Sequence, residues 1–502
     1  MMKKIFIFLL SVVMIIAINS CYNDTGNYDY SQLSNVTITA QDTVYVTQFN
    51  TLTVPVEIDL DGMAEDDYTY SWRLWSNEIG NKLKKSISDT KELSYEVVEV
   101  PGSYTLVFTT TNKLTNVSEY KTIDLMVQGV ISEGWMVLQE KDGKTDFDLI
   151  MSPYFSERHQ EDIILRNLYE SVNGEPLQGH GLKISNYFAL GRYQYVVILT
   201  DEGGVRLSAT TMQKTYDLST LMFDEKPLQP ENYFYFDYYW CLGRGNEVII
   251  SDGRYYINEL LGEGYTEPIL KDGETYRASK WGPKQLWTFK GMIYDELNGR
   301  FLGIQNPYLT ATPLPEAVGR KFDWNNMGAK LLYMDTGFKH YDYGLMEDWD
   351  TQELSLYVLN FDVKNNFDVA MYSADNIPEL ANAKYYAIGE RGNVFFYATD
   401  KDIYLYDYAG SNTGNKAHSV PIDERITNMK IFKPLVDRYI TSHPYDNKIL
   451  ILSTHNDNTG EGKIYMYKFN ESVGTIEKES EKVFDGFGRI LDMDYNYAKY
   501  GS

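Results

Sequence analysis

Short apolar runs separated by turn residues dominate the chain. The runs at 196–199, 248–250 and 394–397 consist of aliphatic or aromatic residues, and Gly, Asn and Asp are frequent between such runs. Runs of this length, rich in β-branched and aromatic residues, are typical of buried β-strands, whereas helical periodicity is rare in this sequence. The pattern predicts an all-β protein.

A repeated phrase precedes three of these runs. It consists of an aromatic pair, a small residue, an aliphatic residue and glycine, and it occurs at 187–191, 239–243 and 385–389. The second copy follows the first by about 50 residues and the third by about three times that, a spacing typical of propeller blades. Candidate central strands begin at Trp135, Val196, Val248, Phe301, Leu356, Val394 and Ile449. We therefore predict a β-propeller of about seven blades over residues 130–502.

The end of the chain supplies the strand that the first blade lacks. The run at 489–495 resembles the run at 425–431, yet too little chain follows it to form another blade. The run that begins at Trp135 has no preceding partner strand. We predict that the C-terminal strand joins the first blade and closes the ring, which removes exposed sheet edges.

The segment 306–350 breaks the regular pattern. It carries three prolines followed by several aromatic residues, and we interpret it as a long insertion between strands. Ordered loops on a rigid scaffold often carry binding residues. The candidate ligand-binding residues are Trp324, His340, Tyr341, Tyr343 and Trp349. Packing between blades is the alternative for these rings, and it is the favoured reading for the aromatic residues of the repeated phrase.

Residues 36–128 predict a second, smaller β domain. Apolar and polar residues alternate along its short runs, and Trp72 lies in a middle strand. About 90 residues with this alternation suit an immunoglobulin-like sandwich with a buried tryptophan.

The first 35 residues have the features of a lipoprotein leader and a tether. Lys3 and Lys4 precede an apolar segment, Ile5 to Ile18, that is too short for a transmembrane helix, and Asn19-Ser20-Cys21 follows it. We expect residues 1–20 to be a signal peptide, Cys21 to be acylated after cleavage, and residues 21–35 to form a tether to the membrane. Cleavage that leaves Cys21 unmodified is the alternative. The second cysteine, Cys241, takes the small-residue position of the repeated phrase and is expected to pack like an alanine.

Cys21, the phrase Gly-Asn-Tyr-Asp-Tyr at 26–30 and the small β domain together resemble the PKD-like lipoproteins of Bacteroidota. These proteins are often encoded beside SusC/SusD-like nutrient uptake systems. The chain lacks the Trp-Asp-Phe-Gly-Asp-Gly phrase of fuller PKD domains and has Trp72-Arg73-Leu74 at that place. The resemblance implies a lipoprotein of the outer membrane, on its surface or its periplasmic face, with a SusC/SusD-like complex as a possible partner. It implies no established activity.

Charge and motifs exclude several functions. The net charge of −25 argues against nucleic acid as a partner, because phosphate binding needs a concentrated basic face. The nucleophile elbow, the phosphate-binding loop, the His-Glu-x-x-His pair and the Cys-x-x-Cys ligand set are all absent from the sequence. The six histidines are scattered, and the acidic turn at 59–67 lacks the full ligand pattern of an EF-hand. We predict no catalytic residue, no cofactor and no metal site.

Binding is the function that this sequence favours. We expect a lipid-anchored protein that captures a glycan or a peptide, or that docks against an uptake complex. One alternative is a propeller hydrolase or lyase that uses carboxylates or histidines at the mouth of the ring, where paired carboxylates would indicate glycosidase chemistry. Another alternative is a structural spacer or an assembly subunit.

Overall fold

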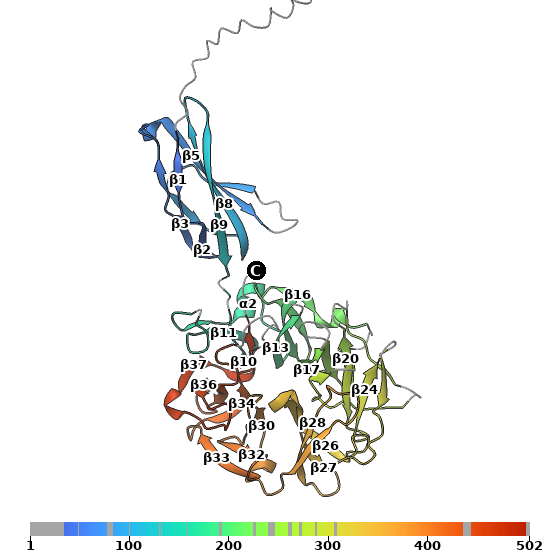
Figure 1. The fold of residues 1–502 in the computed structure, drawn as a ribbon. Helices are drawn as coiled ribbons and strands as arrows, with labels where there is room; N and C mark the ends of the chain where they lie inside the picture. The colour runs from blue at the N-terminus through green and yellow to red at the C-terminus, as the bar shows by residue number, and fades with distance from the viewer. Residues whose placement is uncertain are drawn as a thin grey trace, which may run out of the picture. The chain divides into compact units, whose positions relative to one another are not determined.

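The computed structural model describes residues 35–497, apart from residues 49, 78–83, 100, 130, 132, 158, 190–192, 224–226, 239–245, 260–263, 271–273, 287–288, 306–308 and 435–442. The chain divides into two compact units, Met1–Val130 and Ile131–Ser502 (Figure 1). The predicted leader, Cys21, nearly all of the tether and the second copy of the repeated phrase with Cys241 lie outside the described residues. In the described parts of the chain, no helix is both long and apolar enough to span a membrane.

The first unit is the predicted sandwich. Its larger sheet has the strand order β2 (Thr43–Thr47), β9 (Ser118–Gln128), β8 (Gly102–Asn112), β5 (Tyr68–Ser76) and β6 (Lys84–Ser88). Two strand pairs accompany it, β3 (Thr51–Val54) with β7 (Leu93–Glu96) and β1 (Thr37–Thr39) with β4 (Glu57–Asp59); the short 3₁₀ helix η1 is Glu65–Asp67. Side chains of β2, β3, β5, β7, β8 and β9 share one core. Trp72 is fully buried there, with its ring 4.7 Å from that of Phe108, so the predicted core tryptophan is confirmed.

The second unit contains eight sheets within its described residues: seven sheets of three or four strands, arranged in a ring (Figure 1), and one short two-stranded sheet. We number the seven larger sheets as blades one to seven. Blade one consists of β38 (Arg489–Asn496), β10 (Gly134–Lys141), β11 (Lys144–Met151) and β12 (Ile163–Leu165). Blade two consists of β13 (Gly181–Ala189), β14 (Tyr193–Thr200), β15 (Gly203–Ser208) and β16 (Lys214–Asp217). Blade three consists of β17 (Pro230–Tyr235), β19 (Glu247–Ser251) and β20 (Arg254–Asn258).

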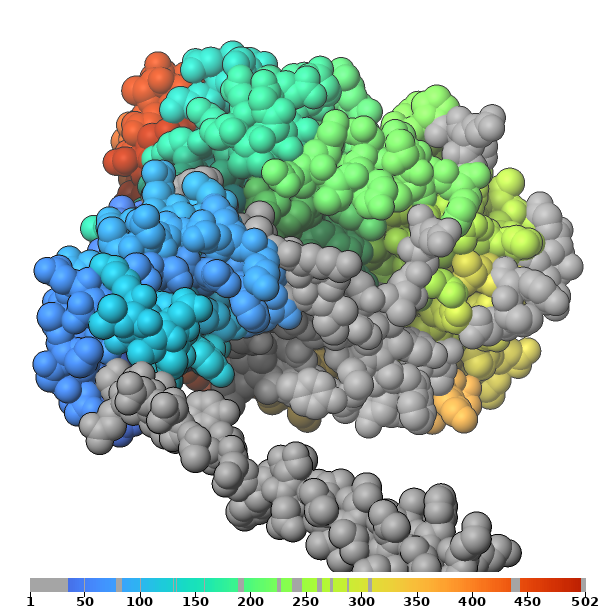
Figure 2. Space-filling view, turned by 90° about the horizontal axis from the view of Figure 1, so that it is seen from above, coloured from blue at the N-terminus to red at the C-terminus, as the bar shows by residue number. Residues whose placement is uncertain are grey.

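The remaining blades follow in chain order; on the face seen in Figure 2, the teal, green and yellow segments of the unit lie side by side in that order. Blade four consists of β23 (Gly291–Asp295), β24 (Arg300–Gln305), β25 (Thr310–Pro313) and β21 (Ile269–Leu270). Blade five consists of β26 (Ala329–Thr336), β27 (Asp342–Asp348), β28 (Leu354–Leu359) and β29 (Asp368–Ser373). Blade six consists of β30 (Tyr385–Ile388), β31 (Phe395–Ala398), β32 (Asp402–Asp407) and β33 (Thr413–Ser419). Blade seven consists of β34 (Arg425–Ile431), β35 (Ile449–His455), β36 (Gly462–Lys468) and β37 (Lys482–Phe487).

Short elements complete the ring. The strand β18 (Asp237–Tyr238) pairs in parallel with β22 (Gln285–Leu286). The helix α2 spans Leu168–Asn173, and the 3₁₀ helices are η2 (Leu218–Leu221), η4 (Phe338–His340), η5 (Leu380–Asn382) and η6 (Lys478–Ser480). The ring is therefore built almost entirely from strands, as the sequence predicts.

The C-terminal strand closes the propeller. β38 pairs antiparallel with β10, from Gly134 opposite Asn496 to Glu140 opposite Arg489, with an irregularity between Leu138 and Gln139. Both the blade count of about seven and the closure by the last strand are confirmed. β10 is therefore paired on both sides, by β38 and by β11, and the two ends of the propeller chain are joined within one sheet.

The interpretation of 306–350 as an insertion is wrong. This segment contains β25 and both β26 and β27 of blade five, and Leu356 lies in the third strand of that blade rather than the second. The second strand, β27, begins Asp342-Tyr343-Gly344, a composition that resembles a turn. All three residues are nevertheless buried, because the core between blades covers them.

Candidate functional site

A central cavity of about 640 Å³ lies on the axis of the ring. In six of the seven blades the first strand in the order given above contributes to its wall, and blade four contributes the segment that leads to β23. Representative lining residues, in blade order, are Asp492, Ser185, Tyr233, Trp281, Asp335, Tyr386 and Lys430. The cavity therefore collects side chains that are far apart in the sequence.

Aromatic side chains form much of this wall. Nine Trp, Tyr and Phe residues line the cavity, from β10, β17, β26, β30 and β38 and from the segment before β23. Some of these rings also pack against each other: Trp281 meets Tyr333 edge-on with 5.3 Å between centroids, and Tyr333 stacks on Tyr386 at 5.4 Å. Aromatic rings held in this way present fixed apolar faces to a ligand.

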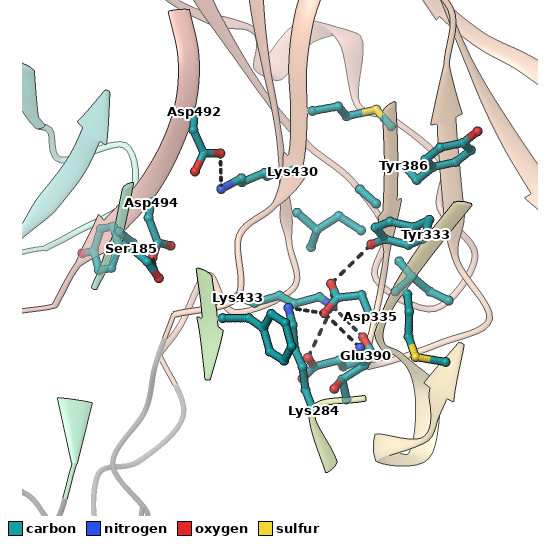
Figure 3. A pocket seen from close by; sticks show the side chains of 18 of the residues that line it. Ser185, Lys284, Tyr333, Asp335, Tyr386, Glu390, Lys430, Lys433, Asp492 and Asp494 are labelled. Atoms are coloured by element: carbon teal, nitrogen blue, oxygen red, sulfur yellow. Dashed lines mark hydrogen bonds and ion pairs between the residues drawn. The ribbon is translucent and has the colours of Figure 1, made fainter. Parts of the chain in front are cut away.

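The first charged group on the wall, the Asp335 cluster, contains Asp335, Lys284 and Lys433 (Figure 3). Asp335 lies at the end of β26, and its carboxylate oxygens are 2.7 Å from Lys284 Nζ and 3.1 Å from Lys433 Nζ. Tyr333 donates its hydroxyl to the same carboxylate at 3.3 Å. Burial disfavours the charged form, but the two ammonium groups outweigh it and hold the pKa of Asp335 well below its usual range. The Asp335 cluster therefore contains two cations and one anion.

The second charged group, the Asp492 cluster, contains Asp492, Asp494, Lys183 and Lys430. Asp492 on β38 lies 2.8 Å from Lys430 Nζ and 3.3 Å from Lys183 Nζ. Burial acts to raise the pKa of Asp492, and the two lysines more than offset this and lower it. Burial also lowers the pKa of Lys183. Asp494 accepts bonds from Ser185 Oγ at 3.2 Å and from the Asn186 amide at 2.8 Å. Two cations therefore face two anions in this cluster.

Glu390 is the carboxylate next to the Asp335 cluster. Its Oε1 lies 3.4 Å from Lys433 Nζ, and its backbone amide donates to Asn447 Oδ1 at 2.8 Å. Asn447 also donates to Asp446, which lines the cavity as well. Burial raises the pKa of Glu390, Lys433 opposes this, and the negative charges of Asp335 and Asp446 add to it. Glu390 therefore takes up a proton more readily than an ordinary glutamate.

The charge of the wall differs from that of the whole chain. Six Lys or Arg and five Asp or Glu residues line the cavity, whereas the chain as a whole has 46 basic and 71 acidic residues. The wall of the cavity is therefore close to neutral, although the protein as a whole is strongly acidic.

Of the five residues that the sequence analysis selected, only His340 lines the cavity. Trp324 is buried in the core of blades four and five, and its indole N–H donates to Pro315 O at 2.7 Å. Tyr343 is buried and Tyr341 is half-buried, and both pack in the next core. Trp349 is 47% exposed at the turn between β27 and β28. The structure thus does not bring the five together, and their binding role stays a prediction.

The repeated phrase contributes more than packing. In its third copy, at the start of β30, Tyr385 and Tyr386 line the cavity together with Glu390 just after the phrase. The resemblance between residues 425–431 and 489–495 contains a sequence signal for the polar residues of the cavity wall. Aligning these runs matches Asn428 with Asp492 and Lys430 with Asp494, so both strands carry polar residues at alternate positions in an otherwise apolar strand. That alternation indicates a polar inner face at the axis.

No cluster of three or more His, Cys, Asp or Glu side chains that could hold a metal ion occurs in the described parts of the chain. The cavity groups form ion pairs with lysines instead of a set of converging ligands. Chemically, the wall can donate hydrogen bonds from ammonium groups, accept them from carboxylates and stack rings against a ligand.

Comparison with known proteins matches the N-terminal part of the chain to a family model. Residues 21–180 match the model of the PKD-like family, which begins at Cys21, covers the sandwich and extends into blade one and the segment that follows it. No curated protein matches the chain. Among solved structures, the chain is similar to a quinoprotein alcohol dehydrogenase-like protein from Bacteroides thetaiotaomicron. The identity is 13%, the match covers 91% of this chain and 96% of that one, and the TM-score is 0.45.

Proposed function

We propose that the protein is a lipid-anchored outer-membrane lipoprotein that binds a nutrient, a glycan or a peptide, in the axial cavity of its propeller. The observation that carries the proposal is the cavity itself, about 640 Å³ in volume, with aromatic walls and two lysine–aspartate clusters. Ligand sites in proteins are commonly clefts of roughly 300 to 1,000 Å³ with mainly apolar walls and a few placed polar groups.

The chemistry of the wall favours a glycan over a peptide. Sugar rings have apolar faces that stack on aromatic side chains, and their hydroxyls both donate and accept hydrogen bonds. The cavity offers aromatic faces at Trp281 and Tyr386, donors at Lys183 and Lys284, and an acceptor at Asp494. This mixture of rings, cations and anions suits a polyhydroxylated ligand.

The membrane anchor rests on the N-terminus. Cys21 follows an apolar leader, and the PKD-like family match begins at that residue. Acyl chains on Cys21 would hold the mature chain at the membrane, since each buried methylene contributes about 0.8 kcal/mol. A SusC/SusD-like uptake complex is the partner that the resemblance to PKD-like lipoproteins suggests. In that setting the protein captures ligand as an accessory of uptake.

A binding screen tests the proposal. The detergent-solubilised full chain is titrated with panels of oligosaccharides and peptides, and we expect saturable binding to oligosaccharides. Tyr386→Ala, which removes a ring from the cavity wall, should weaken that binding. Tyr216→Ala is the matched control, because Tyr216 is 52% exposed on the outer strand β16. No binding by any ligand, or equal losses in the two variants, would contradict the proposal and favour a structural spacer.

One observation favours a second candidate, a glycan hydrolase or lyase. Glu390 and Asp335 contact the same Lys433 Nζ, and their environments shift their pKa values in opposite directions. Carboxylates with divergent pKa values can divide acid and base roles. Asp335, however, is held by two ammonium groups and a hydroxyl, which makes it a poor base. Release of new reducing ends or unsaturated products from the oligosaccharides of the screen, abolished by Glu390→Gln, would establish this candidate.

A further inference from the structure

The two charged clusters on the cavity wall differ in their balance of charge. In the Asp335 cluster two ammonium groups share one carboxylate, whereas the Asp492 cluster pairs Lys183 and Lys430 with two carboxylates, Asp492 and Asp494. Figure 3 shows the clusters at separate places around the cavity. Glu390 also lies 3.4 Å from Lys433 Nζ, so each end of the cavity has two lysines and two carboxylates. The ends differ in that Lys284 contacts a single carboxylate, Asp335, so the Asp335 end has a surplus of ammonium donors there.

The surplus is concentrated at Lys284. Lys433 Nζ already has three acceptors, namely Asp335, the Thr336 carbonyl at 2.6 Å and Glu390. Lys284 Nζ contacts one acceptor, Asp335 Oδ1, among the described residues, and its side chain is 35% exposed. An ammonium group has three N–H donors, so Lys284 keeps donors available to a ligand in the cavity.

The Asp492 cluster offers a different set of partners. Lys430 contacts Asp492 and donates to the Met493 carbonyl, and Lys183 contacts Asp492. Asp494 receives bonds only from neutral donors, Ser185 Oγ and the Asn186 amide, among the described residues. A carboxylate of a ligand would meet Asp494 there, whereas hydroxyl groups can donate to Asp494 and accept from Lys183.

We propose that the cavity selects an acidic saccharide, with Lys284 binding a carboxylate of the ligand and the Asp492 cluster binding its hydroxyls. This inference rests on the proposed binding function of the cavity. Charge-assisted bonds from an ammonium group to a carboxylate are roughly twice as strong as neutral ones, so the carboxylate fixes the orientation of the ligand. Aromatic residues of the wall, such as Trp281 and Tyr386, stack on the sugar rings.

The remaining charges near Lys284 do not cancel this surplus. Glu390 contacts Lys433, and burial raises its pKa, so its negative charge weakens as the pH falls. Asp446 is paired with Arg391. His340 also lines the cavity. The chain as a whole carries a net charge of −25, which repels anions at a distance, so only such a local surplus can accept one.

The test compares matched ligands on the full chain. A trisaccharide of galacturonic acid and the neutral galactose trisaccharide of the same linkage are titrated by calorimetry, together with a short acidic peptide. We expect the acidic trisaccharide to bind at least tenfold more tightly than the neutral one and than the peptide. A neutral trisaccharide that binds equally well or better overturns this inference and leaves the proposed function intact. Tighter binding of the peptide overturns the saccharide, and no binding at all overturns the proposed function itself.

Two variants locate the selectivity. Lys284→Met should remove the preference for the acidic trisaccharide and leave the affinity for the neutral one almost unchanged. Lys183→Met should weaken the binding of both trisaccharides by the same factor, because Lys183 is expected to contact hydroxyl groups that both ligands have. A preference that survives Lys284→Met, or that Lys183→Met removes, contradicts the assignment. Because selectivity is a ratio measured on one protein, its decrease with added salt in the wild-type chain tests the charge mechanism even if a variant is unstable.

Discussion

Two carboxylates in the propeller, the buried Glu247 and the half-buried Asp335, are held in contrasting ways. Glu247 on β19 accepts bonds from three tyrosine hydroxyls, from an asparagine and from the guanidinium of Arg206, at distances that include 2.8 Å to Tyr265 and 3.3 Å to Arg206. The other two hydroxyls are those of Tyr195 and Tyr233. Asp335 faces two ammonium groups and one hydroxyl.

The difference separates a structural role from a ligand-facing one. Around Glu247 one negative charge meets one positive charge, and neutral donors from blades two and three fill the remaining positions. Burial and the charge of Glu247 raise the pKa of Tyr233 and Tyr265 well above the usual value, which keeps both hydroxyls protonated as donors. Around Asp335 positive charge exceeds negative charge, and the surplus faces a cavity. The hydrogen-bond network around Glu247 is satisfied within the protein and stabilises the contact between blades two and three. The cluster around Asp335 has donors left over and can accept a ligand.

The largest effect is expected from Glu247→Gln. The variant leaves Arg206, whose side chain is 13% exposed, without its counter-charge, and breaking a buried pair in this way costs about 3 to 5 kcal/mol. Thermal unfolding of the propeller should shift down accordingly. The control is Glu267→Gln, because Glu267 pairs with Arg254 at the surface, where a salt bridge contributes at most about 1 kcal/mol. Equal shifts in the two variants would show that the Glu247 network does not fasten the blades.

A third carboxylate, Asp342, extends the comparison because no cation pairs with it among the described residues. It is fully buried and accepts the Lys284 amide at 3.0 Å. Burial raises its pKa to about 8, the Lys284 amide opposes this, and Asp335 and Asp362 add to it. The folded state therefore keeps a proton that the unfolded state releases above about pH 4. The free energy of unfolding should fall as the pH rises from about 4 to about 8, by a few kcal/mol.

Asp342→Asn should remove this pH dependence, since the amide mimics the neutral carboxyl. Denaturant unfolding at pH 5 and pH 8 measures it: the variant should be close to the wild type at pH 5 and more stable at pH 8. Asp348→Asn is the control on the same strand, where Asp348 accepts local backbone bonds from Asp350 and Thr351. A wild-type chain whose stability is unchanged between pH 5 and pH 8 would contradict a protonated Asp342.

Asp335→Asn should cost less stability than Glu247→Gln. The lysines that it leaves unpaired have side chains that are 35% and 19% exposed and face the cavity, so water can solvate them. Loss of a partner for partly solvated groups costs roughly 1 to 3 kcal/mol. Unfolding in denaturant, run beside Glu247→Gln, checks the order. A larger loss for Asp335→Asn would mean that this cluster, too, is primarily a fastening between blades.

The fold was largely predictable from the sequence, and the site was not. The apolar runs recur at blade spacing, and the echo between 425–431 and 489–495 revealed the closing strand. The sequence did not predict the charged residues of the cavity, because Asp335, Lys430 and Asp492 come from three different blades and come together only in the closed ring. The sequence places Trp324 and Tyr343 in a long insertion, yet the cores between blades four, five and six bury both side chains. Whether a side chain is buried between two blades depends on how the whole ring packs, and the local sequence pattern does not determine that.

The smallest expected effect concerns Glu390, which decides how large the cation surplus is. Burial raises its pKa, Lys433 and His340 oppose this, and Asp335 and Asp446 add to it. As the pH falls, Glu390 gains a proton and stops balancing Lys433, so the acidic trisaccharide should bind several-fold more tightly at pH 5 than at pH 7. Glu390→Gln should give the tighter affinity at pH 7 already and flatten the profile.

The neutral trisaccharide supplies the internal control, because its affinity should not follow the charge of Glu390. His340→Asn separates the imidazole, which also lines the cavity, from the carboxyl: the pH profile should persist in that variant and vanish in Glu390→Gln. A profile that vanishes only in His340→Asn would transfer the pH response to the histidine. A profile that is flat in the wild type would show that Glu390 keeps one protonation state across this range, so that the unbalanced cluster has a fixed charge like the Glu247 network.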